Sequence, residues 1–211
     1  MKTLFLTGYD KAFAELGDIT SRPMFRYSRR HGFDFFRMTS GAKGEHPSWW
    51  KITKIAKEGF KNYERIIWMD ADMVITNPSI VPPGIEGYHC SRDWGKDSLE
   101  PWKLNNCCWA SFPDSLPLFK WLIDNRENWS QEFHEQNHMR AAARMADMIQ
   151  KGMDDFKITV HPPRVFNAVP IEIHESAVEP WQPGDWAAHL TMVDIDERVR
   201  LAKEFIKMTA W

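Results

Sequence analysis

The stretch IIWMDADMVITNPS, residues 66–79, places two acids directly after an apolar run. The run is nearly continuous, which is typical of a strand covered on both faces, and it predicts a strand over residues 63–69. Such a strand gains no burial free energy from ending on Asp70 and Asp72. We therefore expect the two carboxylates to serve a site at the end of this strand.

The segments before this stretch alternate between strand-like and helix-like patterns. We predict strands over residues 2–9 and 33–40, a helix over residues 20–32 and a helix that starts at Pro47. In the first helix, Ser21 suits the N-cap and Pro23 suits the first turn. The β-α-β-α-β order predicts an α/β fold with a mostly parallel central sheet flanked by helices, whose ligands bind beyond the carboxyl ends of the strands.

The pattern changes after residue 80, and no repeat or linker divides the chain. We predict strands over residues 86–94 and 156–160, helices over residues 114–129, 135–152 and 194–208, and loop with edge strand over residues 161–190. A chain of 211 residues is long enough for one full core, so we expect a single domain, 1–211.

Composition limits the classes of function. The net charge of −2 gives no basic field, which argues against general electrostatic binding to nucleic acid. The cysteines are odd in number and Cys107 and Cys108 are adjacent, a pattern that favours free thiols in a reducing compartment. No segment reaches about 18 apolar residues, and the apolar run at the N-terminus is too short for a signal peptide. We expect a soluble, cytoplasmic protein without a membrane span.

The spacing of the two acids has a chemical reading. In extended backbone, Asp70 and Asp72 would point the same way, with Ala71 turned away. Two converging carboxylates repel each other unless a proton or a cation joins them. A hard divalent cation resolves the repulsion, and phosphate oxygens complete its shell, as a diphosphate leaving group requires. The alternative is that both acids are turn residues at a strand end.

A third ligand is available in WQPGDWAAHL, residues 181–190, where His189 follows a Gly-Asp turn and a short apolar stretch. An imidazole nitrogen beside two carboxylates shifts the preference from Mg²⁺ toward Mn²⁺. The alternative for His189 is a packed, hydrogen-bonded residue without a ligand.

Several segments together resemble a known family. HPSWWKITKIAKEGFKNYERIIWMDADMVITNPS resembles the donor-binding core of A-type (GT-A) glycosyltransferases, in which a Trp-Lys helix precedes a W-x-D-x-D strand end. The nearest resemblance is to the family of fungal galactosyl- and mannosyltransferases and plant xyloglucan xylosyltransferases. Four further segments are similar to that family in the same order over residues 1–195: YSRRHGFDFF, LNNCCWASFPDSLPLFKWL, HEQNHM and WQPGDWAAHL.

The resemblance implies a Rossmann-like sheet and metal-dependent transfer of a sugar, with retention, from a UDP- or GDP-sugar to a hydroxyl acceptor. It implies that Asp70, Asp72 and His189 hold Mn²⁺ (or Mg²⁺) and the donor diphosphate. It also implies a donor site that includes Thr7, Gly8, Lys51, Ala71 and Asn105, with the first two beside the nucleotide and Asn105 in the sugar pocket. Alternatives are a solvated helix face for Lys51 and a turn for Asn105.

The resemblance implies a catalytic set of Asp72, Glu135 and Gln136. Gln136 would lie beside the anomeric carbon and stabilise positive charge on the sugar, with Glu135 nearby, while the leaving phosphate takes the acceptor proton. The alternative for Glu135 and Gln136 is a helix N-terminus that favours an acid. The chain departs from the family at Cys107, where a small Gly is usual, and near Phe112, where an Arg is usual. These departures concern the acceptor or sugar pocket.

In the resemblance, residues 1–80 form the nucleotide-sugar-binding half, and residues 81–211 form the acceptor-side half with a closing helix. The chain lacks the membrane anchor and stem of the Golgi members, so we expect a stripped catalytic domain of bacterial or viral origin. The 11 tryptophans favour a carbohydrate acceptor, although core packing explains most of them. A modified nucleic acid is a less favoured acceptor, and Arg26, Arg29, Arg30 and Lys43 would be its contact patch.

Two other functions stay open at this point. DADMVITN also resembles the first motif of haloacid-dehalogenase-type phosphatases, and Asp154-Asp155 would be the later acids. That motif normally lies on the first strand, whereas here two strands precede it. The other alternative is a non-catalytic protein that binds a nucleotide sugar or a glycan, which would have no need of a metal at a leaving group.

Overall fold

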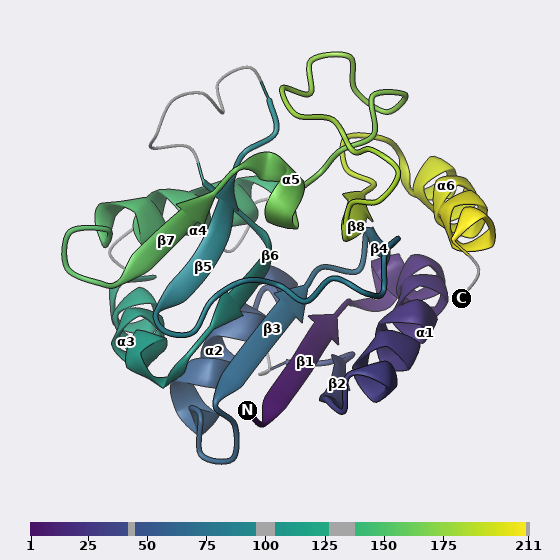
Figure 1. Ribbon diagram of the computed structural model, residues 1–211. Coiled ribbons are helices and arrows are strands. Elements are labelled where there is room, and N and C mark those ends of the chain that lie inside the picture. Colours follow the sequence, from purple (N-terminus) through teal and green to yellow (C-terminus); the bar gives the residue numbers. More distant parts are fainter. Residues whose placement is uncertain (42–44, 96–103, 127–137, 210–211) are drawn as a thin grey trace.

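The computed structural model of the protein describes residues 1–41, 45–95, 104–126 and 138–209, with the side chains of α4 described from residue 145 (Figure 1). Its centre is a six-stranded sheet in the order β2-β1-β3-β6-β5-β7. The strands are β1 (Thr3–Gly8), β2 (Asp34–Met38), β3 (Arg65–Met69), β5 (Tyr88–Arg92), β6 (Leu104–Ser111) and β7 (Ile158–His161). The helices are α1 (Ala14–Arg30), α2 (Trp50–Glu58), α3 (Leu116–Asn125), α4 (His138–Lys151), α5 (Pro163–Phe166) and α6 (Ile195–Met208).

The sheet is mostly parallel. β1 pairs in parallel with β2 and β3, and β5 pairs in parallel with β7. β6 runs antiparallel to both of its neighbours, β3 and β5, and the other described strands of this sheet share one direction. The predicted α/β class, with a mostly parallel central sheet, is confirmed.

Helices cover both faces of the sheet, which explains why β3 is buried along its whole length. The core on one face takes its helical side chains from α2, α3 and α4, including Ile52, Leu118 and Met148. The core on the other face takes them from α1 and α5, including Tyr27 and Phe166. None of the helices in the described parts of the chain combines the length and apolarity needed to cross a membrane.

A small second sheet lies beyond the ends of β1 and β3 (Figure 1). It pairs β4 (Met73–Ile75) with β8 (Ala187–His189) in antiparallel register, with Met73 opposite His189. The sequence pattern does not predict these strands of three residues; it predicts only loop and edge strand over residues 161–190. Their pairing brings the segment after Asp72 next to His189. A third core, between α1, the small sheet and α6, holds this arrangement.

The first helix begins earlier than predicted, so the prediction that Ser21 and Pro23 start it is wrong. α1 begins at Ala14 and both residues are buried inside it. The start is set upstream, where the Asp10 carboxylate accepts from the backbone N–H groups of a 3₁₀ turn that leads into the helix. The helix passes Pro23 because one face is buried at helical spacing, through Leu16, Thr20, Met24 and Tyr27.

Candidate active site

The acids after β3 lie in a turn and not in extended backbone, so the expected i, i+2 geometry is wrong. The backbone N–H of Met73 donates to the carbonyl of Asp70 at 3.2 Å, which closes the turn. The Asp70 N–H donates to Cys107 O at 2.8 Å, and the Thr20 hydroxyl donates to Ala71 O at 2.7 Å. Three elements therefore fix this turn: β3, β6 and α1.

A cavity of about 520 Å³ lies at this turn, beyond the carboxyl ends of β1 and β3. Most of the predicted metal and donor residues line it: Gly8, Lys51, Asp70, Ala71, Asp72, Asn105 and His189. Thr7 is buried in β1 and is not part of the lining. Glu135, Gln136 and Lys43 lie outside the described residues. The turn thus gathers into one cavity residues that are far apart in the sequence.

Asp70 is paired with a buried lysine. Lys51 Nζ lies 3.0 Å from Asp70 Oδ1 and donates to the carbonyl of Asn106 at 2.8 Å, and the indole N–H of Trp68 also donates to Asp70. Only 5% of the Lys51 side chain is exposed, so the solvated-helix alternative is wrong. Burial raises the pKa of Asp70, against the opposing effect of the Lys51 charge, and the nearby Asp72 raises it further.

The pKa of Asp72 is shifted in the opposite direction. Arg198 Nη1 lies 2.7 Å from its Oδ2, and His189 Nε2 lies 3.4 Å from its Oδ1. Burial by itself would raise the pKa of Asp72, but His189 and Arg198 outweigh it and lower the pKa to about 2. Asp72 is therefore an anion at any pH near neutrality.

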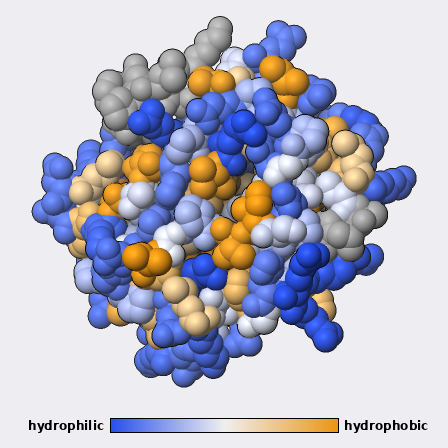
Figure 2. All heavy atoms as spheres, in the orientation of Figure 1, coloured by the Kyte–Doolittle hydropathy of each residue, from blue (hydrophilic) through white to orange (hydrophobic). Residues whose placement is uncertain are grey.

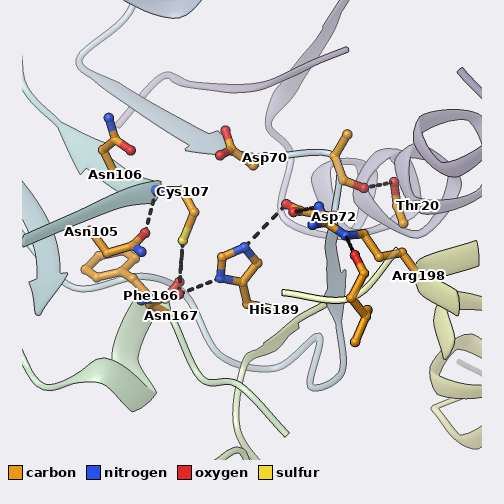
Figure 3. A network of polar contacts seen from close by, with 12 residues as sticks. Thr20, Asp70, Asp72, Asn105, Asn106, Cys107, Phe166, Asn167, His189 and Arg198 are labelled. Atoms are coloured by element: carbon orange, nitrogen blue, oxygen red, sulfur yellow. Dashed lines mark hydrogen bonds and ion pairs between the residues drawn. The ribbon is translucent and has the colours of Figure 1, made fainter. Parts of the chain in front are cut away.

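The orientation of His189 is fixed by an amide (Figure 3). His189 Nδ1 lies 2.6 Å from Asn167 Oδ1, which also accepts from the Cys107 thiol at 3.3 Å. An amide oxygen only accepts, so Nδ1 carries the proton, and Nε2 directs either a lone pair or a second proton at Asp72. With a second proton, Nε2 pairs directly with the Asp72 carboxylate. With a lone pair, the two groups need a cation between them, and in that state they offer a nitrogen and an oxygen ligand to a divalent metal ion.

The three predicted metal ligands do not converge in this structure. Among the described residues, no three His, Cys, Asp or Glu side chains are grouped closely enough to hold a metal ion. Asp72 and His189 are in contact, whereas Asp70 is held by Lys51 and Trp68. Lys51 and Arg198 neutralise the negative charge of the two acids, which was expected to be balanced by a metal ion.

Some site residues were not found from the sequence. Arg198 is one of several basic residues on α6, and Asn167 lies in a proline-rich region without a motif, so neither carried a signal. Asn105 was found, but it lies within β6 and the turn alternative is wrong. Asp154 and Asp155, which the phosphatase alternative needs, are exposed and do not line the cavity.

A second cavity, of about 630 Å³, lies between the segment after β4, α5 and the segment before β8. It is lined by apolar residues and prolines together with a few polar side chains, two of which, Arg164 and Asp185, already form an ion pair with atoms 2.6 Å apart. Figure 2 shows hydrophobic side chains gathered near the middle of the face seen in Figure 1, within a mostly hydrophilic surface. The cavity at the turn after β3, by contrast, is lined by charged side chains, among them Asp70, Asp72, Lys51 and Arg198.

No protein-family model matches the chain, and no curated protein matches it. Solved structures do match. A glycosyltransferase involved in the glycosylation of the major capsid of PBCV-1 is 15% identical over 97% of this chain and 100% of its own, with a TM-score of 0.65.

Two further solved structures match the chain, one from a bacterium and one with bound sugar analogs. The glycosyltransferase GlyE of Streptococcus pneumoniae TIGR4 is 12% identical, with a TM-score of 0.61, over 100% of this chain and 61% of its own. The galactosyltransferase LgtC, in complex with donor and acceptor sugar analogs, is 12% identical, with a TM-score of 0.55, over 98% of this chain and 95% of its own. At these identities the likeness shows the fold. The chain has the A-type fold of these glycosyltransferases, as the resemblance implied.

Proposed function

We propose that the protein is a metal-dependent glycosyltransferase that moves a sugar from a nucleotide-diphosphate sugar to a hydroxyl acceptor, with retention. One observation carries the proposal: the cavity at the carboxyl ends of β1 and β3 brings together the Asp70–Lys51 and Asp72–Arg198 pairs and an oriented imidazole, that of His189. Ligands of open α/β sheets bind at this edge. The matched solved structures with this fold are glycosyltransferases, and one of them is a complex with donor and acceptor sugar analogs.

In this proposal, Asp72 and His189 hold Mn²⁺ or Mg²⁺, with Asp70 as the further carboxylate. The ion would supply positive charge at the diphosphate as the bond to the sugar breaks. Lys51 and Arg198 neutralise the acids before a ligand binds, and their N–H groups then become donors for phosphate and sugar oxygens. Asn167 keeps the His189 ring in the orientation that turns Nε2 toward Asp72.

The nucleotide would lie against the end of β1. A Cβ added to Gly8 would meet the Trp68 ring at 3.0 Å and Met38 Cβ at 3.1 Å, so a larger residue would displace this wall. Tyr9 and Asp10, which follow, line the same cavity. Glu135 and Gln136 keep their proposed catalytic roles, with Gln136 beside the anomeric carbon.

The decisive experiment is nucleotide release from UDP-, GDP- and CMP-sugars without an acceptor, in Mn²⁺, Mg²⁺ or EDTA. We expect slow, metal-dependent hydrolysis of one donor. The variant Asp154→Asn should keep this hydrolysis, because Asp154 is exposed and lies outside the cavity. Metal-dependent nucleotide binding without release, even with glycan acceptors, would favour the non-catalytic alternative. Phosphatase activity without nucleotide binding would refute the proposal.

A further inference from the structure

Met192, in the segment between β8 and α6, has a strained backbone. Its φ is 65°, and among the residues that the structure describes it is the only one other than glycine with a positive φ. In this left-handed region the Cβ of an L-residue crowds the backbone, and methionine lacks the short polar side chain with which asparagine and aspartate bond locally. Such a conformation persists only where the surrounding structure imposes it, and it is often found at ligand sites.

Contacts on both sides of Met192 impose this conformation. Before it, Leu190 is fully buried, and its backbone N–H donates to Asp72 O at 2.8 Å. After it, Val193 O accepts from Arg198 Nε at 2.9 Å, and the Asp194 carboxylate caps the first turn of α6. These fixed points leave only the two residues between them to turn the chain from β8 into α6.

The turn leaves a large apolar residue at the cavity beyond the ends of β1 and β3. Met192 lines this cavity and is 46% exposed, so the protein leaves much of its surface uncovered. Phe13 lines the same cavity, and the Arg198 side chain joins it to the segment of Met192: its Nε donates to Val193 O, and its guanidinium carbon lies 5.8 Å from the centre of the Phe13 ring. The cavity therefore has apolar groups next to its charged pairs.

The chemistry of the proposed donor indicates which part of it fits this apolar surface. The diphosphate needs cations, and the hydroxyls of the sugars need hydrogen-bond partners. Only the nucleobase is aromatic, with two flat faces that carry no charge. The thioether of methionine is polarisable and makes favourable contacts with aromatic rings. An exposed methionine at the cavity wall thus suits the base better than it suits the other parts of the donor.

We propose that Met192 binds the nucleobase of the donor, and that its left-handed backbone holds it at the cavity for this purpose. The inference rests on the proposed function, and it adds a base contact from the segment after β8 to the nucleotide wall proposed at the end of β1. Because the left-handed backbone costs stability, glycine in place of Met192 should change stability and nucleotide affinity in opposite directions.

The test measures the Tm and the calorimetric affinity for UDP and GDP, in Mn²⁺, of Met192→Gly and Met192→Ala. Both variants lose the side chain, but only glycine also relieves the backbone. We expect both to bind the preferred nucleotide about tenfold more weakly, which corresponds to roughly 50–60 Å² of buried apolar surface. The Tm should rise by a few degrees in Met192→Gly and should not rise in Met192→Ala. The affinity for pyrophosphate, followed by electron paramagnetic resonance of Mn²⁺, should stay within twofold, because pyrophosphate has no base.

Two further variants serve as controls. Met192→Leu keeps a large apolar side chain, so its nucleotide affinity should stay within about threefold of the wild type. Met208→Ala, at a position that is 69% exposed at the end of α6, should change neither the affinity nor the Tm.

The assignment is wrong if the glycine and alanine variants bind the nucleotide like the wild type, or if they lose affinity for pyrophosphate to the same extent. A leucine variant as weak as the alanine variant also overturns it. A wild type that binds pyrophosphate with Mn²⁺ as tightly as it binds UDP and GDP overturns the base contact alone. A wild type that binds none of the three refutes the proposed function itself.

Discussion

Arg198 Nη1 lies 2.7 Å from Asp72 Oδ2, and each side chain is 14% exposed. The pair joins residues 126 positions apart and ties α6 to the turn after β3. Arg198 Nε also donates to Val193 O at 2.9 Å, which fixes the plane of the guanidinium. The last helix of the chain is therefore part of the site, because it supplies the counter-charge of a candidate metal ligand.

Arg198→Met should destabilise the protein at pH 7 by roughly 1–2 kcal/mol, because it leaves the Asp72 anion with fewer partners. The pKa of Asp72 lies below its unfolded value, at about 2, so its contribution to stability is present above pH ~4 and is lost as the pH falls toward 2. The free energies of unfolding in urea, measured from pH 7 downward, should therefore converge for wild type and variant in acid.

Arg200→Met is the control for this experiment. Arg200 lies on the same helix and pairs with Glu197 and Glu204 in exposed positions. Exposed ion pairs contribute little to stability, so this variant should unfold like the wild type. Equal destabilisation by the two substitutions would mean that α6, and not the Asp72 pair, accounts for the effect.

Asp72→Asn should abolish Mn²⁺ binding in the presence of nucleotide and lower turnover at least about 100-fold, because the metal would lose an anionic ligand at the leaving group. Asparagine keeps the shape of the side chain, which limits the damage from leaving Arg198 unpaired. Electron paramagnetic resonance of Mn²⁺ titrated with protein and UDP measures the binding. Asp155→Asn, in an exposed turn, is the control. Metal binding retained by Asp72→Asn would exclude Asp72 as a ligand.

The sequence predicted those features of the fold that a local pattern of residues determines. The apolar run of β3 and its abrupt end at two acids are visible within a few residues, and the alternation before them sets the parallel sheet. Asp70 and Asp72 stand out in the sequence because acids after a buried strand conflict with the local pattern.

The rest depends on contacts between distant segments. β4 and β8 are three residues each and pair across more than a hundred positions, so neither leaves a periodic signal. Arg198 looks like any other basic residue of an amphipathic helix until α6 is placed against the turn after β3.

Gly17→Ala should weaken nucleotide binding as well as stability. A Cβ at this position would lie 2.2 Å from the ring of Tyr9, which lines the cavity and donates to Asp18 at 2.6 Å. The better helix propensity of alanine contributes up to about 1 kcal/mol, but forcing the ring aside costs about 1–3 kcal/mol, so the net change is destabilising. Thermal unfolding and UDP titration should both show the loss. Arg22→Ala, exposed on the same helix, should show neither.

The pair of His89 and His161 predicts a loss of stability in mild acid. His89 Nε2 lies 2.8 Å from Glu86 O and so donates to it, which leaves His89 Nδ1 to accept from His161 Nε2 at 2.9 Å. Burial, and then the neighbouring His89, lower the pKa of His161. A lowered histidine pKa means that the folded state favours the neutral ring. The contribution to stability is complete above the unfolded pKa of about 6.5 and is lost as the pH falls through the folded value.

His161→Gln should therefore make the Tm less dependent on pH below about 6.5, because the glutamine cannot be protonated. Its amide can still donate to His89 Nδ1, so much of the contact survives at neutral pH. Thr159→Ser, exposed on the same strand, should keep the wild-type dependence. Thermal unfolding in matched buffers from pH 8 to pH 5 measures the difference. A His161→Gln variant whose Tm falls as steeply with acid as that of the wild type would place the acid sensitivity at other groups.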